Sequence, residues 1–180
     1  MILHKVKEPK VIKNVFSDEQ YLVLKNSLQF FEKDKKFYDE GFGRYCFNNE
    51  VINDFSKKLI PVARKIFASE SLIPSYSLFA HYEGIEAGLF KHKDDNACTY
   101  TIDLCLYQTE PWDLWVEQKP YTLLENEALA YYGNDQEHWR EDFPNPNSQN
   151  VAMIFFHFVE PDHWYITEGP SYIEKIRKLV

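Results

Sequence analysis

The chain has 180 residues and a formal net charge of −8 at pH 7. Its length predicts one domain spanning residues 1–180, and its acidity argues against a nucleic-acid partner. No apolar run approaches the roughly 20 residues that span a bilayer, and the three cysteines form no CxxC pair. We therefore expect a cytoplasmic protein without disulfides that binds neither membranes nor nucleic acid.

The N-terminal third predicts one short strand followed by two helices. "PKVIKNVFS" reads as a strand that leads into a helix, with Ser17 as N-cap and Gln20 completing a capping box. That helix is expected from Asp18 to about Lys33. A second helix is expected from Glu50 to about Ser69, because its apolar residues fall on one helical face, and Pro61 inside it favours a kink.

After Pro74 the pattern changes from helical to extended. Aromatic residues make up 17% of the chain, and they gather here in short runs separated by Gly, Asn, Asp and Pro. The expected strands are "SYSLFAHYEG", "TYTIDLCLY", "DLWVEQ", "ALAYYG" and "NVAMIFFHFV". These runs predict an α+β fold with a double-stranded β-helix (jelly-roll) core and flanking N-terminal helices. The tail "SYIEKIRKLV" predicts a last short helix.

A His-x-Asp pair, His92 and Asp94, precedes one of these strands. Residues i and i+2 of an extended chain point to the same side, so this imidazole and carboxylate can share one metal ion. A metal site needs a third ligand. His138 is a candidate because it comes shortly after the end of the expected strand "ALAYYG". Two histidines and one carboxylate form the facial triad of non-haem Fe(II) oxygenases, which leaves other coordination positions open.

His157 competes with His138 for the role of third ligand. It lies deep within the apolar run "NVAMIFFHFV", whereas a metal site needs its ligands near the open end of the barrel, where substrate arrives. The sequence therefore favours His138 as the ligand and His157 as a hydrogen-bonded interior residue.

With these residues in view, the segment from Tyr76 to Val159 resembles the Fe(II)- and 2-oxoglutarate-dependent oxygenases, in particular their prolyl-hydroxylase-like branch. The resemblance is carried by the His-x-Asp pair, the distal histidine and the blocks "EPWDLWVE" and "YGNDQEHWRE". It implies that His92, Asp94 and His138 bind Fe(II), with 2-oxoglutarate as co-substrate. It also implies a hydroxylase that acts on a protein or peptide side chain or on a small molecule.

The same resemblance implies residues that bind 2-oxoglutarate. Tyr82 stands where such enzymes can place a tyrosine against the co-substrate, although core packing explains it equally well. Family members usually place an Arg or Lys about ten residues after the distal histidine, but residues 147–150 are Asn, Ser, Gln and Asn. Arg140, two residues after His138, is the expected substitute, and an ion pair with Glu141 or Asp142 is its alternative role.

Two other classes of protein stay open at this point. A cupin-type metal-dependent isomerase or hydrolase shares the jelly roll and often uses histidines with a carboxylate. A binding module without metal would use the aromatic residues to bind carbohydrate or peptide. For the oxygenase, we expect the segments Phe37–Phe47 and Lys119–Leu124 to lie over the mouth of the site as mobile elements.

Overall fold

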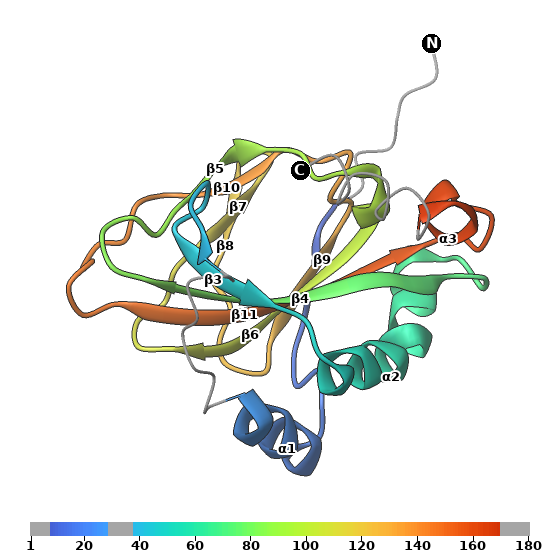
Figure 1. The fold of residues 1–180 in the computed structure, drawn as a ribbon, viewed down its shortest axis with the longest axis horizontal. Helices are drawn as coiled ribbons and strands as arrows, with labels where there is room; N and C mark the ends of the chain where they lie inside the picture. Colours follow the sequence, from blue (N-terminus) through green and yellow to red (C-terminus); the bar gives the residue numbers. More distant parts are fainter. Residues whose placement is uncertain (1–7, 29–37, 170–180) are drawn as a thin grey trace.

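The computed structural model describes residues 8–28 and 38–169. They form two antiparallel sheets stacked face to face, and α1 and α2 lie against the outer side of the larger sheet (Figure 1). The expected α+β fold with a double-stranded β-helix core and N-terminal helices is confirmed. Within the described residues, no helix is both long enough and apolar enough to cross a membrane.

The larger sheet has the strand order β1-β9-β6-β11-β4-β3-β2, and the smaller has the order β5-β10-β7-β8. The strands of the larger sheet are β1 (Lys10–Ile12), β2 (Tyr38–Asp39), β3 (Arg44–Phe47), β4 (Ile73–Glu83), β6 (Tyr100–Gln108), β9 (Ala128–Tyr131) and β11 (Asn150–Val159). Those of the smaller sheet are β5 (Leu89–His92), β7 (Leu114–Val116), β8 (Lys119–Tyr121) and β10 (His138–Arg140). The helices are α1 (Asp18–Leu28), α2 (Glu50–Phe67), α3 (Trp164–Thr167) and a 3-10 turn, η2 (Asn96–Cys98).

The helix boundaries follow from local capping. The predicted capping box is present: the Gln20 amide donates to Ser17 Oγ, and the Ser17 amide donates to Gln20 Oε1. The expected end of the first helix, at 29–33, and the expected C-terminal helix, at 171–180, lie outside the described residues. Helix α2 runs without interruption through Pro61.

Strand β11 separates two hydrophobic cores. Its residues at 152, 154, 156 and 158 pack toward the helices, whereas those at 151, 153 and 155 pack between the sheets. Side chains alternate along a strand, so an element with both faces buried becomes apolar throughout. The core between the sheets stops short of one end of the sandwich, where polar side chains replace apolar ones and form the site described next.

Candidate metal and co-substrate site

His92 and His138 are brought together by strand pairing in the smaller sheet. They are direct partners in the antiparallel pair of β5 and β10, and their ring centroids lie 4.3 Å apart. His92 ends β5, and His138 begins β10. His138 therefore does not end the strand "ALAYYG", as the sequence suggested, but opens a separate short strand in the opposite sheet.

Asp94 lies in the loop just beyond β5 and completes the group. Its Oδ1 is 3.4 Å from His92 Nε2 and 3.5 Å from His138 Nε2. The loop is fixed by the Asp94 amide, which donates to the Gly133 carbonyl at 2.9 Å. A Cβ at position 133 would lie 2.4 Å from Asp94 Oδ2, so only glycine lets the carboxylate sit this close to the backbone.

Both histidines present the same ring nitrogen to Asp94 for the same reason. His92 Nδ1 lies 2.7 Å from the Phe90 carbonyl, and His138 Nδ1 lies 3.0 Å from the Gln136 carbonyl. A carbonyl can only accept, so each Nδ1 carries a proton, and each Nε2 is the ring nitrogen that faces Asp94 and that a metal ion would bind in place of a proton. Metal-binding histidines in proteins are oriented by such a bond from the other ring nitrogen.

The electrostatics of the group favour a bound cation. Burial acts to raise the pKa of the Asp94 carboxyl, but the hydrogen bonds from His138 and His92 outweigh burial and hold this pKa well below its usual range. Burial likewise acts to lower the pKa of His138, and Asp94 outweighs it and raises that pKa. The three donor atoms lie within 4.8 Å of one another. One carboxylate and two imidazoles at this spacing fit a divalent transition metal.

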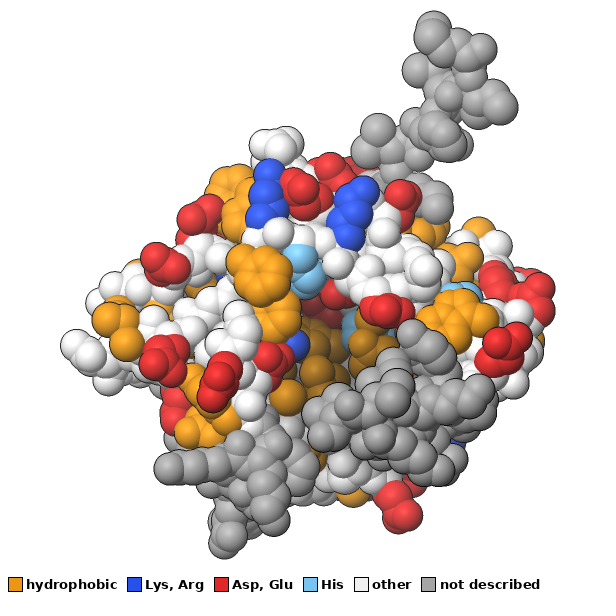
Figure 2. Space-filling view, turned by 45° about the horizontal axis from the view of Figure 1, so that its top comes forward, with side chains coloured by type: hydrophobic (Ala, Val, Ile, Leu, Met, Phe, Trp, Pro, Cys, Tyr) orange, Lys and Arg blue, Asp and Glu red, His pale blue; other side chains and the backbone are white. Residues whose placement is uncertain are grey.

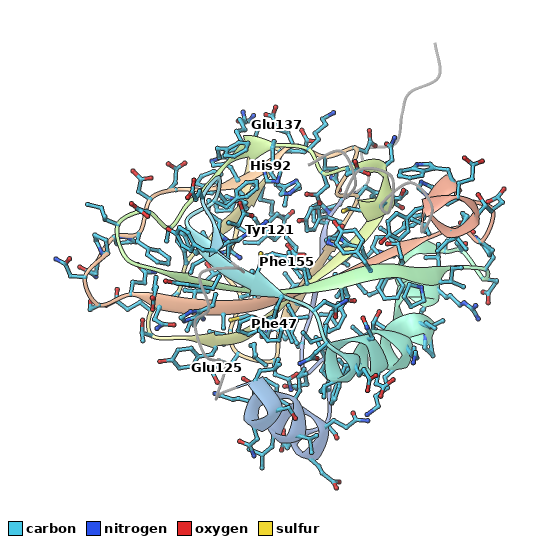
Figure 3. The ribbon with its side chains drawn as sticks, in the orientation of Figure 1. Phe47, His92, Tyr121, Glu125, Glu137 and Phe155 are labelled. Carbon is cyan, nitrogen blue, oxygen red and sulfur yellow. The ribbon has the colours of Figure 1, made fainter. Side chains whose placement is uncertain are left out.

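The three residues open onto a cavity of about 240 Å³ between the sheets. In Figure 2, histidine and hydrophobic side chains surround a hollow on this face. Figure 3 places His92 on the smaller sheet and Phe155 across from it on the larger one, and both line the cavity. The other apolar and aromatic lining residues are Phe42, Tyr76, Leu78, Leu89 and Tyr131.

Arg140 reaches this cavity, as its i+2 spacing from His138 predicted. The side chains of both residues are buried on the same side of β10. The guanidinium donates from Nη1 to the Trp112 carbonyl and lies near the Met153 sulfur, 3.7 Å from Nη2. The alternative ion pair with Glu141 or Asp142 is not formed by Arg140 in the described structure. Its remaining N–H groups are available to a ligand.

Tyr82 is fully buried and lies behind the cavity wall rather than in it. Its hydroxyl accepts a hydrogen bond from Arg44 Nη1 at 2.9 Å, and Arg44 itself lines the cavity. Burial raises the pKa of the Tyr82 hydroxyl, so it stays protonated at neutral pH. Arg44 is a second, partly buried cation at the cavity, and sequence reasoning missed it. It also pairs through Nε with Asp39, at 3.1 Å.

His157 also faces the cavity but is not grouped with His92 and His138. Its Nδ1 lies 3.1 Å from Thr101 Oγ1. Asp94, Cys98 and His157 form a second cluster of possible ligand atoms, also within 4.8 Å. Burial lowers the pKa of His157 to about 4, so the ring is neutral at pH 7. The structure thus puts His157 beside the metal-ligand candidates as a neutral, hydrogen-bonded neighbour.

Two expectations about loops are changed by the structure. Phe37–Phe47 contains the β2–β3 hairpin, whose Phe42 and Arg44 do line the cavity. The segment Lys119–Leu124 begins with β8, which pairs with β7 at the edge of the smaller sheet, and it contributes no residue to the cavity. The prediction that Lys119–Leu124 lies over the mouth of the site was therefore wrong, because residues 119–121 form part of a sheet.

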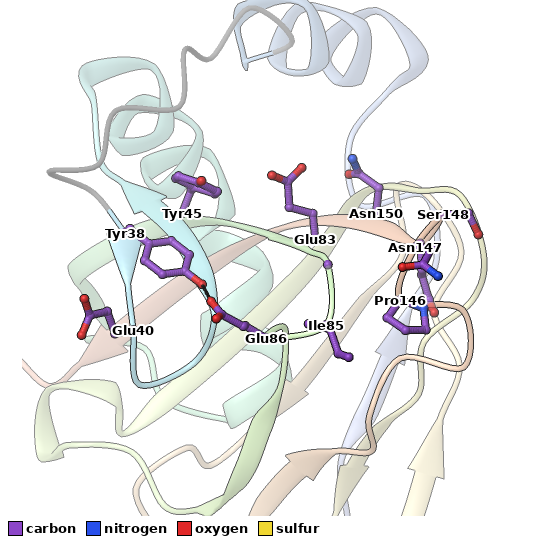
Figure 4. Close-up of a pocket in the computed structure, with 12 residues that line it drawn as sticks. Tyr38, Glu40, Tyr45, Glu83, Ile85, Glu86, Pro146, Asn147, Ser148 and Asn150 are labelled. Atoms are coloured by element: carbon purple, nitrogen blue, oxygen red, sulfur yellow. Dashed lines mark hydrogen bonds between the residues drawn. The ribbon is translucent and has the colours of Figure 1, made fainter.

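A larger hollow, of about 800 Å³, lies outside the sandwich beside the β2–β3 hairpin (Figure 4). Residues 146–150 line this hollow and not the cavity of the candidate site, so the resemblance's expected cation position lies outside that cavity. Glu40, Glu83 and Glu86 line it too, and no Lys or Arg does among the described residues. Its charge does not suit a dicarboxylate such as 2-oxoglutarate.

Several solved structures that are similar to this chain are described as 2-oxoglutarate-dependent enzymes or contain bound 2-oxoglutarate. An oxidoreductase of the 2OG-Fe(II) oxygenase family from Burkholderia pseudomallei aligns with a TM-score of 0.65 at 6% identity, covering 83% of each chain. HygX from Streptomyces hygroscopicus, solved with nickel, 2-oxoglutarate and hygromycin B bound, aligns with a TM-score of 0.67 at 10% identity, covering 86% of this chain and 83% of that one. A Pseudomonas putida prolyl-4-hydroxylase aligns with a TM-score of 0.58 at 9% identity, covering 84% of this chain and 92% of that one.

No protein-family model matches the sequence, and no curated protein matches it either. At identities this low, the likeness shows the fold alone. Over most of its length, then, the chain has the fold of the Fe(II)/2-oxoglutarate oxygenases, a group that includes a prolyl-4-hydroxylase. The similar structures also include an alpha-ketoglutarate-dependent epimerase, SnoN, so the fold does not determine the product.

Proposed function

We propose that this chain is an Fe(II)- and 2-oxoglutarate-dependent oxygenase that hydroxylates a protein side chain or a small molecule. The observation that carries the proposal is the convergence of His92 Nε2, His138 Nε2 and the Asp94 carboxylate at the mouth of a cavity that also holds a buried arginine. The fold shared with 2-oxoglutarate-dependent enzymes supports it.

The three ligand residues would hold the metal from one side only. All come from β5, the loop after it and β10, so the cavity side is left for co-substrate and substrate. When bound, Fe(II) and 2-oxoglutarate would supply the oxidising chemistry, in which O₂ is consumed and the co-substrate loses CO₂. The protein contributes the ligand geometry, through the Nδ1 bonds to Phe90 and Gln136 described above.

Arg140 is the residue we assign to the far carboxylate of 2-oxoglutarate. Arginine binds carboxylates through two parallel hydrogen bonds, and Arg140 keeps N–H groups free for this purpose. Arg44, in contrast, is held by Asp39 and Tyr82. Tyr82 would therefore act indirectly, by orienting Arg44, and not by touching the co-substrate. Phe42, Leu78 and Phe155 would exclude water from the bound ligand.

The test is binding followed by turnover. Protein prepared without oxygen should bind one Fe(II), or Mn(II) as a stable substitute, and then bind 2-oxoglutarate in a metal-dependent way. Asp94→Ala should lose most of the metal affinity, and Arg140→Ala should weaken 2-oxoglutarate while leaving metal binding intact. Metal binding without any heat from millimolar 2-oxoglutarate would favour a cupin-type enzyme instead. Failure to bind metal would favour a binding module.

A further inference from the structure

A buried carboxyl group faces the candidate co-substrate cavity and has no role in the proposed metal site. Asp103 comes from the middle of β6, and only 4% of it is exposed. Its Oδ2 accepts a hydrogen bond from the Tyr131 hydroxyl at 2.9 Å. Its Oδ1 is buried with no hydrogen-bond partner among the described residues, although the residue lines the cavity. An unpaired buried oxygen is costly, and here a ligand could satisfy it.

Asp103 and Arg140 line the same cavity, and each has hydrogen-bonding atoms that no described residue satisfies. The Arg140 guanidinium has N–H donors that the Trp112 carbonyl and the Met153 sulfur leave unused. Asp103 has an oxygen without a donor. The two side chains attract each other, yet no hydrogen bond or ion pair joins them directly. A group that accepts from Arg140 and also shares a proton with Asp103 would satisfy both.

A carboxylate is such a group, provided that Asp103 is neutral when it binds. Two ionised carboxylates in contact repel strongly, so one of a close pair holds a proton. Burial, and then the negative charge of Asp94, raise the pKa of Asp103 to about 7, while His138, Tyr131 and Arg140 act against this rise. The neutral acid is therefore accessible near pH 7, where an exposed Asp would be fully ionised.

The groups that surround Asp103 come from every neighbouring element. Charged or titratable side chains that interact with it are Tyr82 on β4, Asp94 after β5, Cys98 on η2, Tyr131 on β9, and His138 and Arg140 on β10. Its direct register partner on β11 is apolar, Phe155, and so is its partner on β9, Leu129. Arg140 is the only arginine or lysine among these groups.

We propose that Asp103 is a co-substrate-binding residue that meets the far carboxylate of 2-oxoglutarate as a neutral acid and donates its proton into a shared hydrogen bond, while Arg140 donates to the same group. The inference rests on the proposed function. Starting from ionised Asp103, binding of the dianion then takes up one proton from solvent. Tyr131 holds the second carboxyl oxygen and so orients the acid toward the ligand.

Calorimetric titration of Mn(II)-saturated protein with 2-oxoglutarate tests this without requiring turnover. For the parent, Kd should be constant at low pH and should rise by up to about tenfold per pH unit once the pH exceeds the pKa of Asp103 in the metal-loaded protein, because ionised Asp103 must first be protonated. Titrations at about pH 8.5 in two buffers of different ionisation enthalpy should show uptake of nearly one proton. Metal saturation is checked at each pH, so loss of metal cannot imitate the effect.

Two variants separate this role from a structural one. Asp103→Asn keeps the shape and a donor but cannot ionise, so its Kd should stay within about threefold of the parent's low-pH value up to about pH 8.5, with no proton uptake. Tyr131→Phe removes a hydrogen bond that favours the ionised acid, so the rise in Kd should begin at higher pH. Thermal melts show whether each variant is folded.

The outcomes distinguish the two proposals. Should the parent bind Mn(II) and 2-oxoglutarate with a Kd that is independent of pH, the role of Asp103 is wrong and the proposed function stands. If the folded Asp103→Asn protein binds at least tenfold more weakly than the parent at every pH, a neutral donor at this position is not sufficient and the proposed role of Asp103 is wrong. When 2-oxoglutarate binds to the parent at no pH, both proposals fall.

Discussion

Gly133 controls how closely Asp94 approaches the turn after β9. A methyl group at position 133 would meet Asp94 Oδ2, Thr101 Oγ1 and the Cys98 carbonyl, all within 2.7 Å. Backbone and short side chains cannot yield that much without moving the loop. The position of the carboxylate therefore depends on a glycine outside the ligand set, which the His-x-Asp pattern gave no reason to notice.

Gly133→Ala should consequently weaken metal binding. We expect the Kd for Mn(II) to rise about 10- to 100-fold, the range seen when groups that orient metal ligands are lost. Gly88→Ala is the matched control, because a Cβ there meets nothing within 4 Å and its backbone needs no left-handed conformation. Calorimetry on both variants checks this, and equal affinities would show that the Asp94 loop adapts freely.

Single substitutions also test the choice between His138 and His157 as the third metal ligand. His138 Nε2 lies beside Asp94 with its Nδ1 fixed by a carbonyl, so His138→Ala should raise the Kd for Mn(II) at least about 100-fold. His157 bonds Thr101 instead, so His157→Ala should bind metal nearly as well as the parent while melting at a lower temperature. The reverse pattern in folded variants would make His157 the ligand.

The site residues that could be predicted each lie close in the sequence to another predicted site residue, whereas those that were missed reach the site only through the tertiary fold. His92, Asp94 and Arg140 were found because spacing of two along an extended chain places side chains on one side. Arg44 reaches the cavity from a hairpin about fifty residues before His92, and only strand pairing brings it there. Asp103 did leave a signal, since a carboxyl in the middle of "TYTIDLCLY" cannot be buried without a reason.

Among the elements, the long strands were the easiest to predict from the sequence. The strands β4, β6 and β11 have 9 to 11 residues, and all three were predicted. Three of the four strands of the smaller sheet have only three residues, too few to show an alternating pattern. The sheet that carries both histidines was therefore only partly visible, and β8 was taken for a loop.

Strand β11 imposes a pH dependence on stability, because it carries His157 into the interior. The folded pKa is about 4, below the ordinary value of 6.5, so only the unfolded chain gains this proton as the pH falls from about 6.5 to 4. Stability should fall over that interval, by about 3 kcal/mol at most from this residue. Urea unfolding of metal-free parent and His157→Gln at about pH 7 and 4 measures it. Equal losses in the two proteins would contradict the assignment.

For the whole molecule, the two-sheet arrangement makes metal binding and folding stability inseparable. The candidate ligands come from β5, its following loop and β10, and these meet only when the smaller sheet has formed. In the unfolded chain these three residues span 46 positions, from His92 to His138, and have no fixed geometry. A metal that prefers the folded arrangement must therefore stabilise the fold.

Mn(II) at about 100 times its Kd should stabilise the parent by about 2.7 kcal/mol, which for a chain of this size raises Tm by roughly 5–10 °C. The folded Asp94→Ala protein should melt at the same temperature with and without Mn(II), which rules out nonspecific binding to the acidic surface as the cause. Thermal melts with Mg(II) provide a further control, because imidazole ligands favour transition metals. A parent whose Tm does not respond to Mn(II) would be a metal-free jelly-roll module, in which His92, Asp94 and His138 merely form a buried hydrogen-bonded cluster.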